Sequence, residues 1–182
     1  MTGERLRLFV ALDLPADVRV ALADWADRAA PAAVRRVPAE NLHVTLAFLG
    51  SRAAHEAEAV AALLPALGEL ERLGELRAAG ALWLAPRRPG VLTVALDDSA
   101  PLAALHGALV AALAETAGYE PEQRLFRPHV TVGRVRRGTR IDTCAALDQP
   151  TLTFRADGLT LYRSHTGPGG SRYEPLAGAS SS

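Results

Sequence analysis

The sequence contains no lysine, a single cysteine and few aromatic residues, which make up 5% of its 182 residues. With Cys144 alone, the chain can form neither an internal disulfide nor a thiolate metal cluster. All 20 basic residues are therefore arginines, and 20 acidic residues balance them to a formal net charge of zero. A neutral chain is not expected to coat nucleic acid through broad electrostatics, but a local patch of arginines suits forked contacts to phosphate.

Long apolar runs are also missing, although 49% of the residues are hydrophobic. Residues 5–14 are largely apolar, but they include Arg7 and Asp13 and stop before Pro15, so the run is too short for a membrane span. The composition favours a folded cytoplasmic protein with one compact domain over residues 1–176. The terminal Ala-Gly-Ala-Ser-Ser-Ser at 177–182 is expected to be a disordered tail.

Hydrophobic periodicity and turn residues predict alternating strands and helices. Ser99 and Pro101 are typical of a helix start, and Gly118 of a helix end. The expected helices cover residues 16–29, 53–67 and 99–117. The expected strands cover residues 6–12, 42–49, 76–84, 91–96, 129–135, one or two within 151–162, and 173–176. The two halves of the chain have a similar order of elements, which indicates a pseudo-duplicated fold.

The tripeptide His-Val-Thr occurs twice, at residues 43–45 and 129–131, each time on a predicted strand. Residues two apart on a strand point to the same side, so each histidine shares a face with its threonine. If the two strands are neighbours, one cleft receives two imidazoles and two hydroxyl groups.

This set of groups suits the opening of a cyclic phosphodiester. Water must lose a proton as it attacks phosphorus, and the departing ribose oxygen must gain one. An imidazole with a pKa near about 6.5 can act as base or acid at neutral pH. Threonine hydroxyls can donate hydrogen bonds to the non-bridging oxygens.

Two simpler interpretations compete with this one. A single histidine on a half-buried strand is most often a structural residue, but the doubled motif disfavours that reading. A zinc site is the other alternative, yet the two histidines are far apart in sequence and no His-Glu-x-x-His pattern supplies further ligands. We therefore expect neither a metal nor another cofactor.

With these motifs the sequence resembles the two-histidine (2H) phosphoesterase superfamily, which is defined by two His-x-Thr/Ser motifs. Within it, the sequence is similar to the bacterial and archaeal RNA 2',3'-cyclic phosphodiesterases, also called 2'-5' RNA ligases. Four stretches carry the resemblance: RLFVALDLP, NLHVTLAFLG, FRPHVTVGRV and LTLYRSHTGPGGSRYEPL.

The resemblance implies a bilobed, pseudo-symmetric α+β fold, with two antiparallel sheets around a central groove and helices on the outside. It also implies metal-independent conversion of an RNA 2',3'-cyclic phosphate to a 2'-phosphomonoester. In this scheme His43 is the acid that protonates the leaving 3'-oxygen, and His129 is the base that activates water. Thr45 and Thr131 hold the phosphate.

Further candidate site residues lie in or beside the four matching stretches. Arg134, three residues after Thr131, would reach the phosphate only if the strand bulges near Gly133. Aromatic or cationic contacts to the nucleobase or the groove are expected from a set in or beside the matching stretches: Phe9, Phe48, Phe126, Tyr162 and Arg172. His55 and His106 are expected to be exposed on helices.

Two other functions use the same residues or the same groove. One is 2'-5' RNA ligation, or hydrolysis of another 2'-5'-linked or cyclic nucleotide diester. The other is a non-catalytic nucleotide- or RNA-binding module, which the presence of both histidines disfavours. The expected partners are RNA ends or nucleotides carrying a cyclic phosphate, without a membrane, and we expect a monomer.

Overall fold

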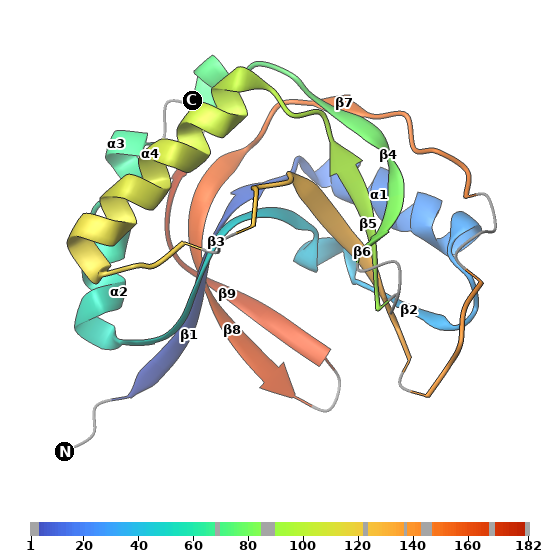
Figure 1. The fold of residues 1–182 in the computed structure, drawn as a ribbon, viewed down its shortest axis with the longest axis horizontal. Coiled ribbons are helices and arrows are strands. Elements are labelled where there is room, and N and C mark those ends of the chain that lie inside the picture. The colour runs from blue at the N-terminus through green and yellow to red at the C-terminus, as the bar shows by residue number, and fades with distance from the viewer. Residues whose placement is uncertain are drawn as a thin grey trace.

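The structure of the chain, a computed structural model, describes residues 4–67, 70–84, 90–121, 124–136, 138–142, 147–167 and 170–180. Within these residues nine strands form a curled, antiparallel sheet with the order β7-β4-β5-β6-β3-β1-β8-β9, and β2 pairs with β6 off this path (Figure 1). The bounds of the strands are β1 Arg5–Asp13, β2 Val34–Arg36, β3 His43–Ala53, β4 Leu76–Leu84, β5 Val91–Leu96, β6 His129–Val135, β7 Thr153–Phe154, β8 Gly158–Gly167 and β9 Gly170–Ser180.

Helices flank this sheet, and they confirm the predicted α+β class. α1 (Ala16–Ala29) packs against β2 and β6, whereas α2 (Ala54–Ala61) packs against β1 and β3. α3 (Leu64–Leu67) and α4 (Ala100–Ala117) lie beside α2 on that second flank (Figure 1). Two short 3-10 helices, Ala39–Asn41 and Leu70–Leu73, complete the described helical structure.

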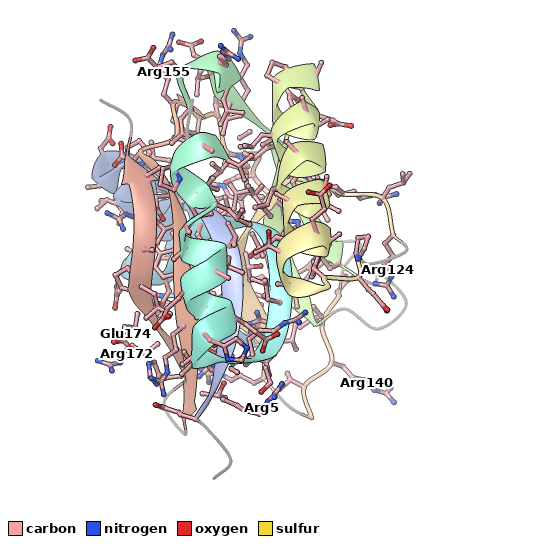
Figure 2. The ribbon with its side chains drawn as sticks, turned by 90° about the vertical axis from the view of Figure 1, so that its left-hand side faces the viewer. Arg5, Arg124, Arg140, Arg155, Arg172 and Glu174 are labelled. Carbon is pink, nitrogen blue, oxygen red and sulfur yellow. The ribbon has the colours of Figure 1, made fainter. Side chains whose placement is uncertain are left out.

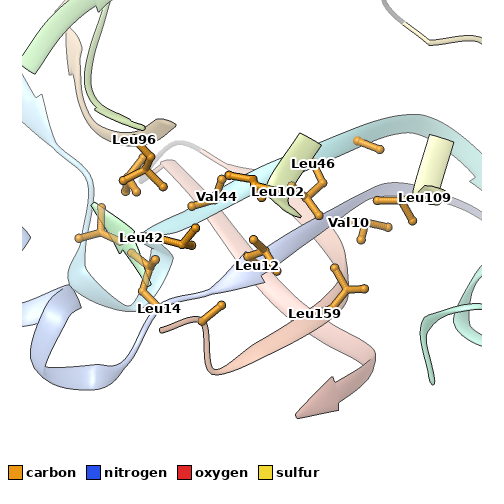
Figure 3. Packing of buried hydrophobic residues seen from close by; sticks show 14 of the residues in the cluster. Val10, Leu12, Leu14, Leu42, Val44, Leu46, Leu96, Leu102, Leu109 and Leu159 are labelled. Carbon is orange, nitrogen blue, oxygen red and sulfur yellow. The ribbon is translucent and has the colours of Figure 1, made fainter. Parts of the chain in front are cut away.

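α4 has the ends that its sequence predicts. The Ser99 hydroxyl accepts the Leu102 N–H at 3.4 Å, and Gly118 ends the helix in the left-handed conformation with φ 54°. By length and composition alone, its 18 residues with a mean hydropathy of 1.4 would be enough to cross a membrane. Its leucines Leu102, Leu109 and Leu113 are completely buried, and Figure 3 shows the first two pointing at the sheet. α4 is thus a core-packing helix.

One face of the sheet is apolar and faces the helices, and the other face carries polar and aromatic side chains. On β1, the even-numbered residues Leu6, Leu8, Val10 and Leu12 belong to the core (Figure 3). The odd-numbered Asp13 and its neighbours on that side face away from this core. This alternation is the period of two expected for a strand.

The two halves of the sheet are joined at one residue pair. β3 and β6 run antiparallel and are in register at Val44 and Val130, both with 0% exposure. The halves on either side, β3-β1-β8-β9 and β6-β5-β4-β7, are the two predicted sheets, connected edge to edge. The two His-Val-Thr motifs therefore lie side by side at the centre.

Each motif strand bulges directly after its threonine. On β3, Thr45 pairs with Ala11 and Ala47 with Val10, so Leu46 is an extra residue. On β6, Thr131 pairs with Thr93 and Gly133 with Leu92, so Val132 is extra. An extra residue reverses which face the following side chains occupy. The conditional prediction of a bulge near Gly133 is thus confirmed.

Several elements differ from the sequence-based expectations. β2 was not expected, because three residues between Pro31 and Pro38 are too few to show a periodic pattern. The strand forms through its pairing with β6. β3 does not stop at Gly50, which takes φ 70° within the strand. The single helix expected at 53–67 is divided, because Pro65 lacks an N–H and disfavours a continuous helix before it.

The predicted tail at 177–182 is also corrected in part. Residues 177–180 are the end of β9, where Ala179 pairs with Leu159 and Ser180 with Gly158. Backbone pairing orders this segment although its side chains are small. Cys144 and residues 86–89 of the predicted hairpin loop lie outside the described residues, while β4 and β5 pair antiparallel as expected.

The close packing of β2 on β6 gives a stability prediction. A Cβ atom on Gly133 would lie 2.4 Å from Cγ1 of the buried Val34, whereas a Cβ atom on Gly107 of α4 meets nothing within 4 Å. We expect Gly133→Ala to lower the free energy of unfolding by about 1–3 kcal/mol through overpacking. The matched control Gly107→Ala should raise it by about 0.5–1 kcal/mol. Urea denaturation measures both, and equal effects would contradict this packing.

Candidate active site

The antiparallel register at Val44 and Val130 brings the four motif side chains onto one face. One residue on either side of this pair, His43 lies at the register position of Thr131, and Thr45 at that of His129. The two valines are buried on the helix side, while these four residues are half-buried on the other. The sequence prediction that two imidazoles and two hydroxyl groups share one face is met by this geometry.

Both imidazole rings are oriented by the same backbone contact. Nδ1 of His43 lies 2.8 Å from the carbonyl oxygen of Asn41, and Nδ1 of His129 lies 2.7 Å from that of Arg127. A carbonyl oxygen only accepts, so each Nδ1 carries the hydrogen. In the neutral ring, Nε2 is then the basic nitrogen, which is the atom available for proton transfer.

Nε2 of His43 has a hydrogen-bond partner within its own motif. It lies 3.0 Å from Oγ1 of Thr45. The hydroxyl donates to Nε2 when the ring is neutral and accepts from Nε2–H when the ring is protonated. The Thr45 hydroxyl therefore changes between donor and acceptor with the protonation state of His43.

A group of aromatic rings surrounds His43 on the groove face. Phe9 lies 4.9 Å from the imidazole between ring centroids, and Tyr173 lies 5.2 Å from it, edge-on. Tyr162 stacks on Phe9 at 5.2 Å between centroids and lies 6.3 Å from the imidazole. Phe9 lies on the groove face but is only 2% exposed, because the surrounding rings cover it. The alternation of residues on β1 predicts the face on which Phe9 lies, but it cannot predict that other rings cover Phe9.

Asp13 lies beneath this aromatic group and faces His43 across the β1–β3 register. Its carboxylate accepts the Thr160 hydroxyl and the Tyr162 hydroxyl, each at 2.6 Å. Burial and the acceptor Asp13 hold the pKa of Tyr162 far above its usual range, so its hydroxyl remains a donor. Tyr162, a predicted groove contact, thus binds Asp13 through its polar end and Phe9 through its ring.

Burial lowers the pKa of His43 below its ordinary value of 6.5, since the imidazolium is poorly solvated there. The Asn41 carbonyl and the negative charge of Asp13 oppose this shift. His129 and Arg134 add to it, because a nearby positive charge disfavours the imidazolium. The neutral form of His43 is therefore favoured at neutral pH in the free protein.

The two bulges place Phe48 and Arg134 at equivalent positions, each three residues after a motif threonine. Without the bulge, alternation would turn both side chains toward the helices. Instead Phe48 is 58% exposed, Arg134 is exposed, and the charge of Arg134 acts on His43. Arg134 is thereby brought to the motif face, as the sequence analysis required for a phosphate contact.

A large pocket of about 680 Å³ opens on the His129 side of the motifs. Its volume falls in the range of small-molecule sites. The lining residues come from both motif strands, from α4 and from the segment before β6; they include Thr45, Phe48, His106, Arg124, Phe126, Arg127 and His129. The pocket thus joins one imidazole to exposed aromatic surface and to arginines, and Figure 2 shows Arg124 beyond the end of α4.

His106 was expected to be exposed on its helix, and this is wrong. Its ring stacks on Phe126 with centroids 4.0 Å apart and planes 6° apart, and burial lowers its pKa. Phe126 and His106 thus form one part of the wall of the large pocket. Phe48 and Phe126 are thus the two predicted aromatic residues that face this pocket.

A second, smaller pocket of about 90 Å³ lies on the His43 side. It is lined by residues of β2, β6, β9 and the segment before β3: Arg35, Arg36, Val37, Pro38, Asn41, Arg134, Gly170, Ser171 and Tyr173. Tyr173 touches His43 as well, so the two imidazoles lie between a large and a small pocket.

Arg172 was expected to reach the groove, and the structure places it elsewhere. Tyr173 points to the groove face, so the neighbouring Arg172 on β9 points to the other side, where Figure 2 shows it beside Glu174 at the surface. Sequence reasoning chose the wrong member of this pair. The alternation of β9 would have identified Tyr173 only if the face of that strand had been known.

In the part of the chain that the structure describes, no group of three or more His, Cys, Asp or Glu side chains is arranged to hold a metal ion. The groups that the two motifs and their neighbours present on this face include imidazoles, hydroxyl groups and guanidinium groups. These groups can transfer protons and bind an anion with several oxygen atoms.

Known proteins share this architecture. The RNA 2',3'-cyclic phosphodiesterase of Escherichia coli (strain K12) is 31% identical over 185 residues, covering 96% of both chains. The RNA 2',3'-cyclic phosphodiesterase of Thermus thermophilus is 29% identical over 181 residues, covering 94% of this chain and 88% of the relative.

Solved structures agree with these relatives. A crystal structure of a Thermus thermophilus protein has a TM-score of 0.83 and 30% identity, and covers 96% of this chain and 97% of that one. E. coli LigT complexed with 3'-AMP has a TM-score of 0.75 and 30% identity, and covers 97% and 98%. The model of the 2'-5' RNA ligase superfamily matches residues 14–168. With both His-x-Thr motifs paired at its centre, the chain belongs to the 2'-5' RNA ligase superfamily.

Proposed function

We propose that the protein hydrolyses 2',3'-cyclic phosphate ends of RNA to 2'-phosphomonoesters, with His43 and His129 as a metal-independent acid/base pair. The observation that carries this proposal is the pairing of the two motif strands, which presents two imidazoles with basic Nε2 atoms on one face. The names of the relatives support the substrate, because they are RNA 2',3'-cyclic phosphodiesterases. The same proposal includes the cytoplasmic location and the monomeric state expected from the sequence.

In the proposed reaction His129 accepts a proton from water as the water oxygen attacks phosphorus. The bond between phosphorus and the ribose 3'-oxygen breaks, and His43 gives its Nε2 proton to that oxygen. The product keeps the phosphate on the 2'-oxygen, and one proton has moved through each imidazole. Thr45, Thr131 and Arg134 would bind the non-bridging oxygens, where negative charge increases.

The lowered pKa of His43 bears directly on this assignment. The acid role requires the imidazolium, whereas burial favours the neutral ring in the free protein. A bound phosphodiester brings a negative charge beside the ring, and an opposite charge raises the pKa of an imidazole. We therefore propose that substrate binding raises the pKa of His43 and so favours its protonated form. In the reverse reaction the two histidines exchange roles.

The large pocket suits the terminal nucleoside. It connects directly with His129 and Thr45, and it presents Phe48 and the Phe126–His106 pair as stacking surfaces. E. coli LigT, a structural neighbour, has been crystallised with 3'-AMP, which is a nucleotide of the size that this pocket accepts.

A second candidate function is 2'-5' RNA ligation, which the name of the matched superfamily favours. In that reaction a ribose 5'-hydroxyl takes the place of water as the attacking group. It requires the same two imidazoles and the same phosphate contacts, so both activities belong to one site.

The two-histidine mechanism predicts the behaviour of single variants. With a short RNA ending in a 2',3'-cyclic phosphate and with EDTA present, we expect the wild-type protein to form only the 2'-phosphate. His43→Ala and His129→Ala should each lower kcat by about 10²-fold or more, since each removes one proton transfer. The control His55→Ala changes an exposed histidine on α2 and should keep full activity. Full activity in either motif variant would disprove the mechanism, and an inactive wild-type protein would disprove the substrate.

The enclosed position of His43 predicts the direction in which the pKa of its imidazole is shifted. In an NMR titration of the free protein, His43 should titrate below pH 6.5 because burial disfavours the imidazolium. The negative charge of Asp13 raises this pKa, so Asp13→Asn should lower it further. Asp17→Asn, on the first turn of α1, removes the same charge elsewhere and serves as the control. A pKa of His43 at or above 6.5 in the free wild-type protein would contradict this account of the site.

If Phe48 stacks on the nucleobase, removing its ring should weaken substrate binding and leave the chemical step unchanged. Phe48→Ala should raise KM for a nucleoside 2',3'-cyclic phosphate by roughly 5- to 150-fold, since base stacking on an aromatic ring contributes about 1–3 kcal/mol. kcat should change far less. Val20→Ala, at a 55% exposed position on α1, is the control. An unchanged KM in Phe48→Ala would remove Phe48 from the nucleoside site.

A further inference from the structure

We infer that His106 selects the nucleobase in the large pocket, because one nitrogen of its ring accepts a hydrogen bond from an amino group on the edge of the base. The protein would then favour a base with such an amino group, as adenine has, over the same purine without it. This inference rests on the proposed function and adds a specificity-determining residue to it.

His106 occupies a core position of α4. One face of the helix carries a row of residues that are four, three and four positions apart: Leu102, His106, Leu109 and Leu113. The three leucines are each 0% exposed. His106 is half-buried, and it is the residue of α4 that lines the large pocket. The row therefore changes from leucine to histidine at the position where it meets the pocket.

A histidine at this position has a cost that a leucine would not have. An imidazole carries two polar nitrogens, and burying a polar group is unfavourable unless it forms hydrogen bonds. A leucine would continue the apolar row and pack against the same core. The polar side chain at the edge of the pocket therefore indicates a role in the pocket rather than in the core.

Two contacts fix the orientation of the ring. Phe126 stacks on it with centroids 4.0 Å apart and planes 6° apart. The backbone carbonyl of Leu46, the extra residue of the β3 bulge, accepts a hydrogen bond from one ring nitrogen. His106 thus connects α4 to β3 and to the segment before β6, and its ring is held in place before a ligand binds.

The second ring nitrogen is an acceptor. Burial lowers the pKa of His106, so the neutral ring is favoured at neutral pH. In a neutral imidazole one nitrogen donates and the other accepts. Because the Leu46 carbonyl takes the donor, the acceptor is left for a ligand in the pocket that His106 lines.

The rest of the pocket offers few side-chain acceptors. The described residues that line it include no Asp, Glu, Asn or Gln. The arginines of the lining only donate, and the other imidazole and the threonine belong to the motifs. Tyr119, with 8% exposure, is the other lining side chain outside the motifs that has an acceptor oxygen. The more open His106 is therefore the acceptor that we assign to the base.

An acceptor in the wall discriminates between bases by their edges. A base that stacks on Phe48 or Phe126 uses its flat face, and its hydrogen-bonding edge stays free. Adenine carries an amino group at position 6, which donates, whereas guanine carries an oxygen there, which only accepts. The amino group is thus the feature of the base that His106 can recognise.

The experiment compares two substrates that differ by one amino group: adenosine 2',3'-cyclic phosphate and purine riboside 2',3'-cyclic phosphate. kcat/KM is measured for the wild-type protein, His106→Phe, His106→Leu and Tyr119→Phe. His106→Phe keeps an aromatic ring against Phe126, and His106→Leu continues the leucine row, so both variants should fold. His55→Phe makes the same exchange at an exposed position of α2 and is the control.

In the wild-type protein, His55→Phe and Tyr119→Phe, we expect kcat/KM to be about 3- to 10-fold higher for the adenosine substrate, as one added hydrogen bond usually gives. The difference should lie in KM, since the contact is to the base and not to the reacting phosphate. In both His106 variants the ratio should fall below about twofold, while kcat/KM for the purine riboside substrate stays within about threefold of the wild type. A variant that merely damaged the pocket would lower kcat/KM for both substrates.

Failure of this inference can be distinguished from failure of the proposed function. A wild-type ratio near one, or a ratio that either His106 variant keeps, would overturn the inference. Loss of the ratio in Tyr119→Phe would also overturn it and assign the base contact to Tyr119. In each of these cases the substrates are still hydrolysed, so the cyclic phosphodiesterase activity stands.

If neither substrate is hydrolysed, the proposed function fails and calorimetry tests the base contact alone. The ligands are then 3'-AMP and purine riboside 3'-monophosphate, which again differ by the amino group. Tighter binding of 3'-AMP by the wild-type protein but not by His106→Phe would support the role of His106. The absence of such a difference would overturn it.

Discussion

The pairing of Val44 with Val130 is the interaction on which the whole site depends. It joins two half-sheets that otherwise pair only within themselves, and both valines are fully buried beneath the motif face. The residues on either side of each valine must then point the opposite way, onto one common surface. A shift of the register by one residue would turn the histidines and threonines into the core. Packing of two apolar side chains thus fixes the position of four polar ones.

Much of this fold could be predicted from the sequence, because local signals determine it. α4 begins and ends where Ser99 and Gly118 predict, and β6 begins directly after Pro128. The shared face of His43 and Thr45 follows from strand alternation alone. β2, the end of β9 and the role of Tyr173 could not be predicted in this way, since a tertiary neighbour determines each of them. Phe9 illustrates the same limit: its sequence gives a face, and only the folded chain gives the rings that cover it.

The two histidines have the same backbone contact but different surroundings. His43 is enclosed by Phe9, Tyr173 and, through Tyr162, the half-buried carboxylate of Asp13. His129 lines the open pocket. The enclosure lowers the pKa of His43 and limits the orientations of its ring, and the Thr45 hydroxyl meets its Nε2. Identical motifs thus lie in different surroundings, and those around His43 lower the pKa of its imidazole.

The two bulges have a consequence for the symmetry of the groove. The two motif strands are antiparallel about the Val44–Val130 pair, and each bulge turns the side chain three residues after the threonine to the motif face. On one side this side chain is Phe48, and on the other it is Arg134. A groove with two equal ends would accept a chain in either orientation. Here one end offers an aromatic ring and the other a cation. The two ends of the groove are therefore not equivalent, and a chain bound in one orientation makes different contacts from a chain bound in the other.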